Sequence, residues 1–244
     1  METYSCNDFL DAVLHNHVEC IQKLIVARAD PNVAGITGCR PLHYACSMGY
    51  DACVKKLIEA GADVDVGNAY GHTPLHCAAW KGRDTLCKTL VAAGANLNAV
   101  NSDGDTPLHQ AVCSGYDTVC KTLIEAGADV DIVNGRGKTP LQKAVDYTVN
   151  YADIYGYNKK CVDVLVECTL KVRTLADYEW DIIPTVMNIG PLLPIVLTRY
   201  GRDAAAKMVS KLPEEKRKAL ETATLGLSRF VSRDVAEQIL VRCV

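Results

Sequence analysis

The sequence predicts an all-α solenoid in which pairs of helices stack side by side. The prediction rests on two strings that recur in phase. The first reads RPLHYACSMG, TPLHCAAWKG, TPLHQAVCSG and TPLQKAVDY, and its prolines recur at one constant interval, at Pro41, Pro74, Pro107 and Pro140. The second follows three of these copies as VKKLIEAGADVDV, KTLVAAGANLNAV and KTLIEAGADVDIV. Self-similarity at such a period is typical of stacked supersecondary units that bury a continuous core between them.

The first helix of each unit is predicted to begin at the repeated proline. In three of the four copies the residue before the proline is a threonine, whose hydroxyl can accept a hydrogen bond from a free N–H group at a helix start. Proline at the first helical position loses no hydrogen bond, because its missing N–H would be unpaired there anyway. The remaining copy carries Arg40 in place of threonine.

The second helix of each unit follows a turn at a glycine, such as Gly49. Its apolar residues fall at helical spacing, as Val54, Leu57 and Ile58 do, and are predicted to form one buried face. Another glycine ends each second helix, in the position where a left-handed cap is usual. The segments that come next are predicted to form hairpin-like fingers over residues 63–70, 96–103 and 129–136.

These strings resemble the ankyrin repeat, whose signature TPLHxA recurs with a period of about 33 residues. Two copies match it outright, and the copy with Arg40 departs only in its first residue. The N-terminal stretch FLDAVLHNHVECIQKLIVARADPN fits the same frame without the TPLH start, as a capping unit does. The resemblance implies a five-unit ankyrin array over residues 1–170, the fifth unit carrying an insertion. A helical C-terminal subdomain over residues 171–244 is expected to pack on the array.

The stretch GHTPLHCAAW holds two imidazoles and a thiol, which are ligand types that zinc prefers. His43, His76 and His109 recur in register, however, and stacked helices lie about 8–10 Å apart, so neighbouring members cannot share one ion. The resemblance implies instead that each hydrogen-bonds the finger of an adjacent repeat, with Gln142 in a similar polar role. His72 falls at a variable position and is expected to face a partner. We therefore predict no metal site and no cofactor.

The bulk composition excludes several function classes. A net charge of −3 and a pI near 6.1 provide no broad positive field for nucleic acid or anionic lipid. No apolar stretch reaches the ~18 residues of a membrane helix, and the N-terminus lacks the features of a signal peptide. The twelve cysteines include no CxxC pair, and no nucleophile elbow, phosphate-binding glycine loop or HExxH motif occurs. We expect a non-enzymatic protein in the cytoplasm, with the nucleus as an alternative.

In proteins of this family the fingertips and the exposed positions of the first helix form a concave surface. Residues that break the period there are free to recognise a partner. Trp80 and Tyr70 are expected to form an aromatic anchor, because both residue types are enriched in interface hot spots. The alternative is that Trp80 only packs over the neighbouring helix end. The predicted partner-binding residues are Ile36, Met48, Tyr70, His72, Trp80, Lys81, Asp103, Asp105, Ser114, Arg136, Lys138 and Tyr147.

This surface runs from apolar through acidic to basic, which suits a partner protein or an extended peptide better than a small-molecule substrate. The resemblance implies an interaction module or scaffold that binds such a partner on its concave face. Its alternative is a substrate-recognition adaptor whose C-terminal helices recruit ubiquitin-ligase machinery. The string LPEE at residues 212–215 is similar to the opening of an F-box. Nucleic acid and membranes are not expected as partners.

Overall fold

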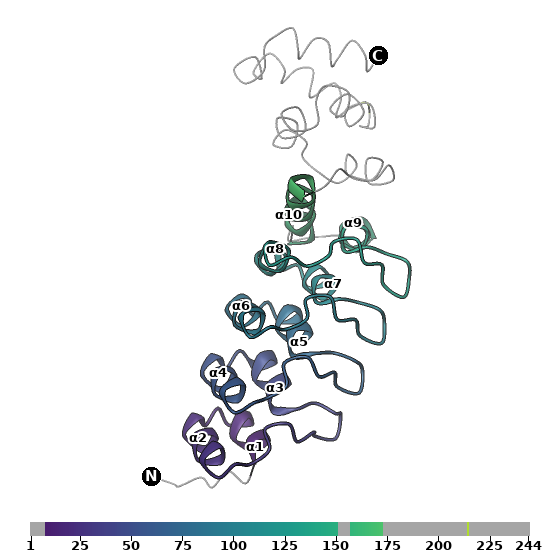
Figure 1. The fold of residues 1–244 in the computed structure, drawn as a ribbon. Coiled ribbons are helices and arrows are strands. Elements are labelled where there is room, and N and C mark those ends of the chain that lie inside the picture. Colours follow the sequence, from purple (N-terminus) through teal and green to yellow (C-terminus); the bar gives the residue numbers. More distant parts are fainter. Residues whose placement is uncertain (1–7, 151–156, 173–213, 215–244) are drawn as a thin grey trace, which may run out of the picture. The chain divides into compact units, whose positions relative to one another are not determined.

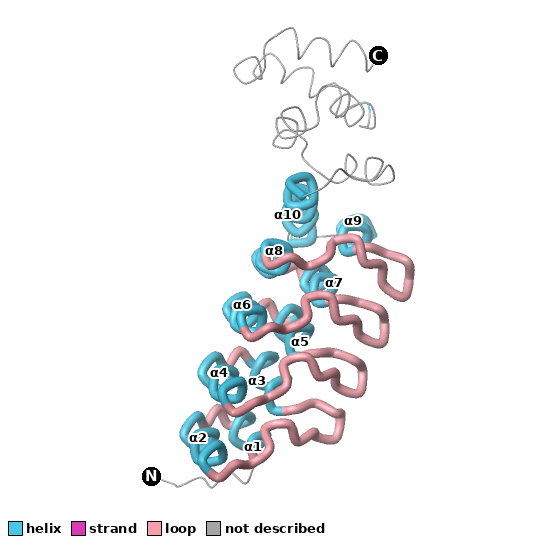
Figure 2. Tube along the Cα trace, in the orientation of Figure 1, coloured by secondary structure: helices cyan, strands magenta, loops and turns pink. Residues whose placement is uncertain are grey.

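The computed structural model describes residues 8–150, 157–172 and 214, with the side chains of residues 8–147, 160–167 and 214. It divides into two compact units, Met1–Ala144 and Val145–Val244. Within the described residues every regular element is a helix, and the segments between them are loops and turns (Figure 2). The predicted all-α repeat solenoid is therefore confirmed.

The helices come in pairs along the chain. Those of the first unit are α1 (Phe9–Leu14), α2 (Val18–Val26), α3 (Pro41–Met48), α4 (Asp51–Glu59), α5 (Pro74–Trp80), α6 (Asp84–Ala92), α7 (Pro107–Cys113) and α8 (Asp117–Glu125). Helix α9 (Pro140–Asn150) begins in the first unit, and α10 (Tyr157–Val172) belongs to the second. The odd-numbered helices α1 to α7 stack in one layer and the even-numbered helices α2 to α8 in the other (Figure 1).

The first helices begin where the sequence predicts. Helices α3, α5, α7 and α9 all start at the repeated proline. The hydroxyl of Thr73 accepts a hydrogen bond from the backbone N–H of His76 at 3.4 Å, and Thr106 caps α7 in the same way. These bonds satisfy N–H groups that have no partner inside the helix.

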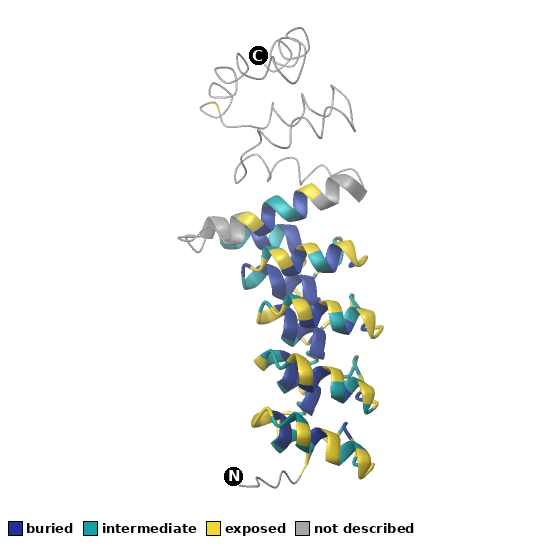
Figure 3. Ribbon diagram, turned by 90° about the vertical axis from the view of Figure 1, so that its left-hand side faces the viewer, coloured by how far each residue is buried: buried dark blue, intermediate teal, exposed yellow. Residues whose placement is uncertain are grey.

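The core is a strip of side chains that recurs in both layers. Figure 3 shows buried residues running through the middle of successive helices, with exposed residues at their outer ends. The leucines at equivalent places, all at most 1% exposed, are Leu42, Leu75 and Leu108 in first helices and Leu57, Leu90 and Leu123 in second helices. Burial of each of these leucines stabilises the folded chain by about 2 kcal/mol of transfer free energy. The repeated apolar positions are therefore the ones that hold neighbouring repeats together.

Four loops connect a second helix to the next first helix, and they project on the side of the first helices (Figure 1). We call them finger 1 (residues 30–40), finger 2 (63–73), finger 3 (96–106) and finger 4 (129–139). Neighbouring fingers are joined by backbone hydrogen bonds, from Ser102 N–H to the Tyr70 carbonyl at 3.0 Å and from Gly135 N–H to the Asp103 carbonyl at 2.8 Å. The fingers are thus one continuous ladder of turns.

Part of the predicted organisation lies outside the described residues. This applies to most of the inserted segment, to nearly all of the C-terminal subdomain and to LPEE apart from Glu214. The domain boundary after residue 170 and the ubiquitin-ligase alternative therefore stay predictions. Among the helices that the structure describes, none is long and apolar enough to span a membrane.

Candidate functional site

The fingers and the first helices together present a row of side chains to solvent. The fingertip position recurs once per repeat as Thr37, Tyr70, Asp103 and Arg136, and all four are exposed. The last turn of each first helix supplies a second row beside it. We call the exposed residues of these two rows, together with Ile36 next to the tip of finger 1, the finger surface.

The shape of the tips of fingers 2, 3 and 4 is fixed by an asparagine, whereas finger 1 has Gly35 at the equivalent position. The side-chain oxygen of Asn101 accepts hydrogen bonds from the backbone N–H groups of Asp103 and Asp105, both at 2.9 Å. Asn68 and Asn134 make the same pair of bonds in fingers 2 and 4. An Asx turn of this kind holds the backbone without using the side chain at the tip. These asparagines were not predicted from the sequence, although their recurrence at the repeat interval was a usable signal.

The histidine ladder has the structural role that the sequence predicts. The Nε2 atoms of His43, His76 and His109 each lie 2.9 Å from a carbonyl oxygen of the following finger, that of His72, Asp105 and Lys138 respectively. The carbonyl can only accept, so Nε2 carries the proton. Nδ1 of His43, His76 and His109 is left to accept the backbone N–H of the residue that precedes the proline.

Burial sets the protonation state of this ladder. Loss of solvation lowers the pKa of His76 to about 4, and it also lowers the pKa of His43 and of His109. Both ring nitrogens of each histidine are occupied, so none has a lone pair free for a metal. In the fifth unit Gln142 takes the capping half of this role, because its side-chain oxygen accepts the N–H of Thr139 at 2.9 Å.

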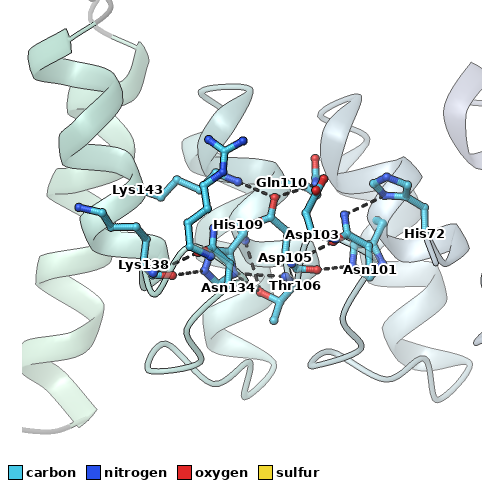
Figure 4. A network of polar contacts seen from close by, with 12 residues as sticks. His72, Asn101, Asp103, Asp105, Thr106, His109, Gln110, Asn134, Lys138 and Lys143 are labelled. Atoms are coloured by element: carbon cyan, nitrogen blue, oxygen red, sulfur yellow. Dashed lines mark hydrogen bonds and ion pairs between the residues drawn. The ribbon is translucent and has the colours of Figure 1, made fainter. Parts of the chain in front are cut away.

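Asp105 is the centre of a buried network that joins fingers 3 and 4 to α9 (Figure 4). One carboxylate oxygen accepts from the amide of Asn134 at 2.8 Å. The other accepts from the ammonium of Lys143 at 2.5 Å and from the amide of Gln110 at 3.2 Å. Burial alone would raise the pKa of Asp105, but the Lys143 and Asn134 bonds outweigh it and hold the pKa below its usual value.

This network corrects one expectation. Asp105 was expected to present its carboxylate to a partner, but the residue is only 5% exposed. All of its hydrogen-bonding capacity is directed into the chain, to groups up to 38 residues away. The acidic part of the finger surface is therefore provided by Asp103 alone.

The other predicted residues differ in exposure. Those exposed to solvent are Ile36, Met48, Tyr70, Trp80, Lys81, Asp103 and Arg136. Those that are partly buried are His72, Ser114, Lys138 and Tyr147. Tyr147 falls in the second compact unit, so its place relative to the finger surface stays a prediction.

Trp80 and Leu14 occupy equivalent positions two repeats apart. Trp80 is 48% exposed at the end of α5, and Leu14 is 49% exposed at the end of α1. Leu14 was not predicted, because its unit lacks the TPLH start that marks the register. Counting back two repeat periods from Trp80 identifies it.

His72 lies in finger 2, close to Asn101 of finger 3. Its ring meets that of His76 edge to face, with 5.5 Å between centroids, and its Nδ1 atom lies 3.5 Å from the amide nitrogen of Asn101. Burial lowers its pKa, while the carboxylates of Asp103 and Asp105 act in the opposite direction. The side chain is therefore part of the floor of the finger surface and is neutral near pH 7.

Four of the described cysteines, Cys46, Cys53, Cys77 and Cys87, do not resemble activated nucleophiles, because burial raises the pKa of each. Burial raises the pKa of Cys77 and of Cys87 to about 12, so both thiols stay protonated at neutral pH. Within the same part of the chain, no three His, Cys, Asp or Glu side chains are grouped in a way that could hold a metal ion.

Comparison with known proteins agrees with this architecture. A family model described as "Ankyrin repeats (3 copies)" matches residues 9–101 and, again, residues 84–176. A search of curated proteins found no match. The two matched ranges overlap and together cover more than half of the 244 residues. Repeats of this kind are generally protein–protein interaction modules and are generally non-enzymatic. The chain belongs to the ankyrin-repeat family.

Proposed function

We propose that this chain is a non-enzymatic scaffold that binds a partner protein on its concave face, through the finger surface. The observation that supports the proposal is that five exposed apolar side chains lie at or next to fingertips or at first-helix ends of the first three repeats. These are Leu14, Ile36, Met48, Tyr70 and Trp80. Apolar groups that cluster outside the core mark interaction sites more often than scattered ones do.

The repeat pattern explains why these residues are not needed for stacking. Stacking uses the buried leucines and the histidine ladder, and the Asx turns hold the fingertips through backbone groups. Each of these five side chains is at least 48% exposed, so a large part of each is not used in closing the fold. Trp80 and Tyr70 supply large, rigid apolar area, which is why such residues dominate many interfaces. We place the protein in the cytoplasm, as expected from cysteines that are spread along the chain without pairing motifs.

The test is affinity capture from a native lysate with the full chain as bait, followed by mass spectrometry. The expected result is a set of captured proteins that Trp80→Ala and Tyr70→Ala each reduce by at least about tenfold. The matched control is Val26→Ala, which removes a side chain that is exposed on α2, in the other helix layer. Equal thermal unfolding of the three variants establishes that the fold is retained. Capture that survives both aromatic substitutions contradicts the proposal.

A further inference from the structure

We infer that the partner presents an extended, polyproline-II-like segment whose side chains read apolar, apolar, basic, acidic at every third residue, in either chain direction. This inference rests on the proposed function and specifies the chemistry of the partner at the same surface. It follows from the order of side chains along the finger surface and from the spacing of the repeats.

The apolar half of the pattern comes from the first three repeats. Ile36 is fully exposed next to the tip of finger 1, and Tyr70 is 62% exposed at the tip of finger 2. Met48 and Trp80 are 49% and 48% exposed at the ends of α3 and α5. Two successive repeats thus offer apolar contact area at both the fingertip and the helix end.

The charged half comes from the next two fingertips. Asp103 and Arg136 occupy the same position of fingers 3 and 4, and the bond from Gly135 N–H to the Asp103 carbonyl keeps the two tips adjacent. Both residues are exposed, and neither makes an ion pair within the described part of the chain. A partner with a cation opposite Asp103 and an anion opposite Arg136 would satisfy both charges.

The buried charges do not disturb this pattern. The carboxylate of Asp105 is neutralised by the ammonium of Lys143, whose side chain is 15% exposed. Lys138 adds positive charge two residues after Arg136. Finger 4 also carries the exposed Asp129 and Asp131 at its start, so its positive charge is confined to the tip and the residues after it. An acidic residue of the partner is therefore favoured opposite the tip.

The spacing of the repeats selects the conformation of the segment. Packed helices lie about 8–10 Å apart, so equivalent positions of neighbouring repeats are separated by about that distance. In a polyproline II segment every third residue lies on the same face and rises about 9 Å. A β-strand places same-face residues about 7 or 13 Å apart, and neither value matches the repeat spacing. The extended three-residue step is the one that brings each partner side chain over its own repeat.

The experiment is a selection of displayed random peptides on the full chain, with peptides long enough to cover four repeat steps. The expected consensus has two apolar residues, a basic residue and an acidic residue, each three positions after the last, or the reverse order. The consensus peptide is then synthesised and its affinity measured by fluorescence anisotropy. Insertion of one residue between the apolar and the charged pair is expected to weaken binding by about tenfold or more.

Charge reversal separates this inference from a general effect on folding. Arg136→Glu is expected to weaken the consensus peptide by about tenfold, and a peptide with lysine in place of its acidic residue is expected to regain most of that loss. The matched control is Lys55→Glu, which makes the same change of net charge at an exposed position of α4. It is expected to leave the affinity unchanged.

The outcomes distinguish the inference about the extended segment from the proposed function of the finger surface. Peptides that need Trp80 but are indifferent to Arg136→Glu overturn the charge pattern and leave the proposed function standing. Peptides indifferent to both Trp80→Ala and Arg136→Glu contradict the proposed surface itself. A selection that enriches no peptide overturns the extended segment, and the lysate capture then decides the proposed function separately.

Discussion

Fingers 2 and 3 have the same backbone but use the residue before their threonine in opposite ways. His72 and Asp105 both receive the histidine of the preceding repeat on their carbonyl oxygen, and both are approached by the asparagine of the next finger. Asp105 is buried in a four-membered network, whereas His72 remains partly exposed.

The difference comes from the next first helix. The residue that would pair with His72 in the position of Lys143 is Gln110, and its amide is already bonded to Asp105. The same repeat backbone therefore supports two kinds of junction between fingers. We call the junction at finger 3 closed, because Asp105 is buried in its network, and the junction at finger 2 open, because His72 stays partly exposed. The repeat fixes the backbone, while one side chain 38 residues away decides whether a position becomes core or surface.

The largest effect is expected from breaking the closed junction. Lys143→Met removes the ammonium and leaves the buried carboxylate of Asp105 without its ionic partner, which should lower the free energy of unfolding by about 3–5 kcal/mol. Urea denaturation at pH 7 measures it. The control is Lys88→Met, because Lys88 is mostly exposed and solvent screens its pair with Asp84, so the loss should be much smaller. Equal losses in the two variants would show that Asp105 does not depend on Lys143.

Acid should act on His76 and on Asp105 in different pH windows. The folded pKa of His76 is about 4 and its unfolded value is 6.5, so the unfolded state binds more protons between these values and stability falls as the pH falls through this range. This histidine alone should cost about 3 kcal/mol.

The pKa of Asp105 is also lowered, but from 3.8, so its contribution is fully present above that value and is lost only below it. Urea midpoints measured from pH 7.5 to 3 should therefore decrease in two stages. His76→Leu should weaken the dependence above pH 4 and leave the lower stage intact. A stability profile that is flat from pH 7 to 4 would be inconsistent with a neutral histidine ladder.

A smaller effect is expected from the glycines at the ends of fingers 3 and 4. Gly104 and Gly137 both have positive φ values, of 74° and 68°. A Cβ on Gly104 would lie 2.5 Å from the backbone nitrogen of Gly135, whereas one on Gly137 would meet nothing within 4 Å. Gly137→Ala should therefore cost about 1–2 kcal/mol of backbone strain, and Gly104→Ala should cost more because the fingers must also move apart. Thermal unfolding of the two variants compares them, and equal costs would argue against tight contact between the fingers.

The sequence predicts the array well because the array is local. The proline, the threonine, the buried leucines and the histidine of each repeat lie within one unit or its neighbour, and their recurrence once per repeat shows which of them are used for stacking. Tyr70 and Trp80 could be predicted as exposed from the same alignment of repeats, because neither residue recurs at its position in the other repeats.

The repeat period cannot predict an ion pair between two residues that both differ from the repeat pattern. Asp105 and Lys143 are each unusual for their position, and each looks like a surface charge when taken alone. Only the structure places them 2.5 Å apart, where the pair forms part of the interior. Leu14 was missed for a simpler reason, since its repeat has lost the signature that gives the register.

The Asx turns make the fingertips interchangeable. Because Asn68, Asn101 and Asn134 hold each turn through backbone N–H groups, the identity of the residue at the tip carries almost no cost for folding. Tyrosine, aspartate and arginine already occupy the same place in successive units. A substitution at one of these tips can therefore change the side chain that faces solvent without altering the turn that displays it.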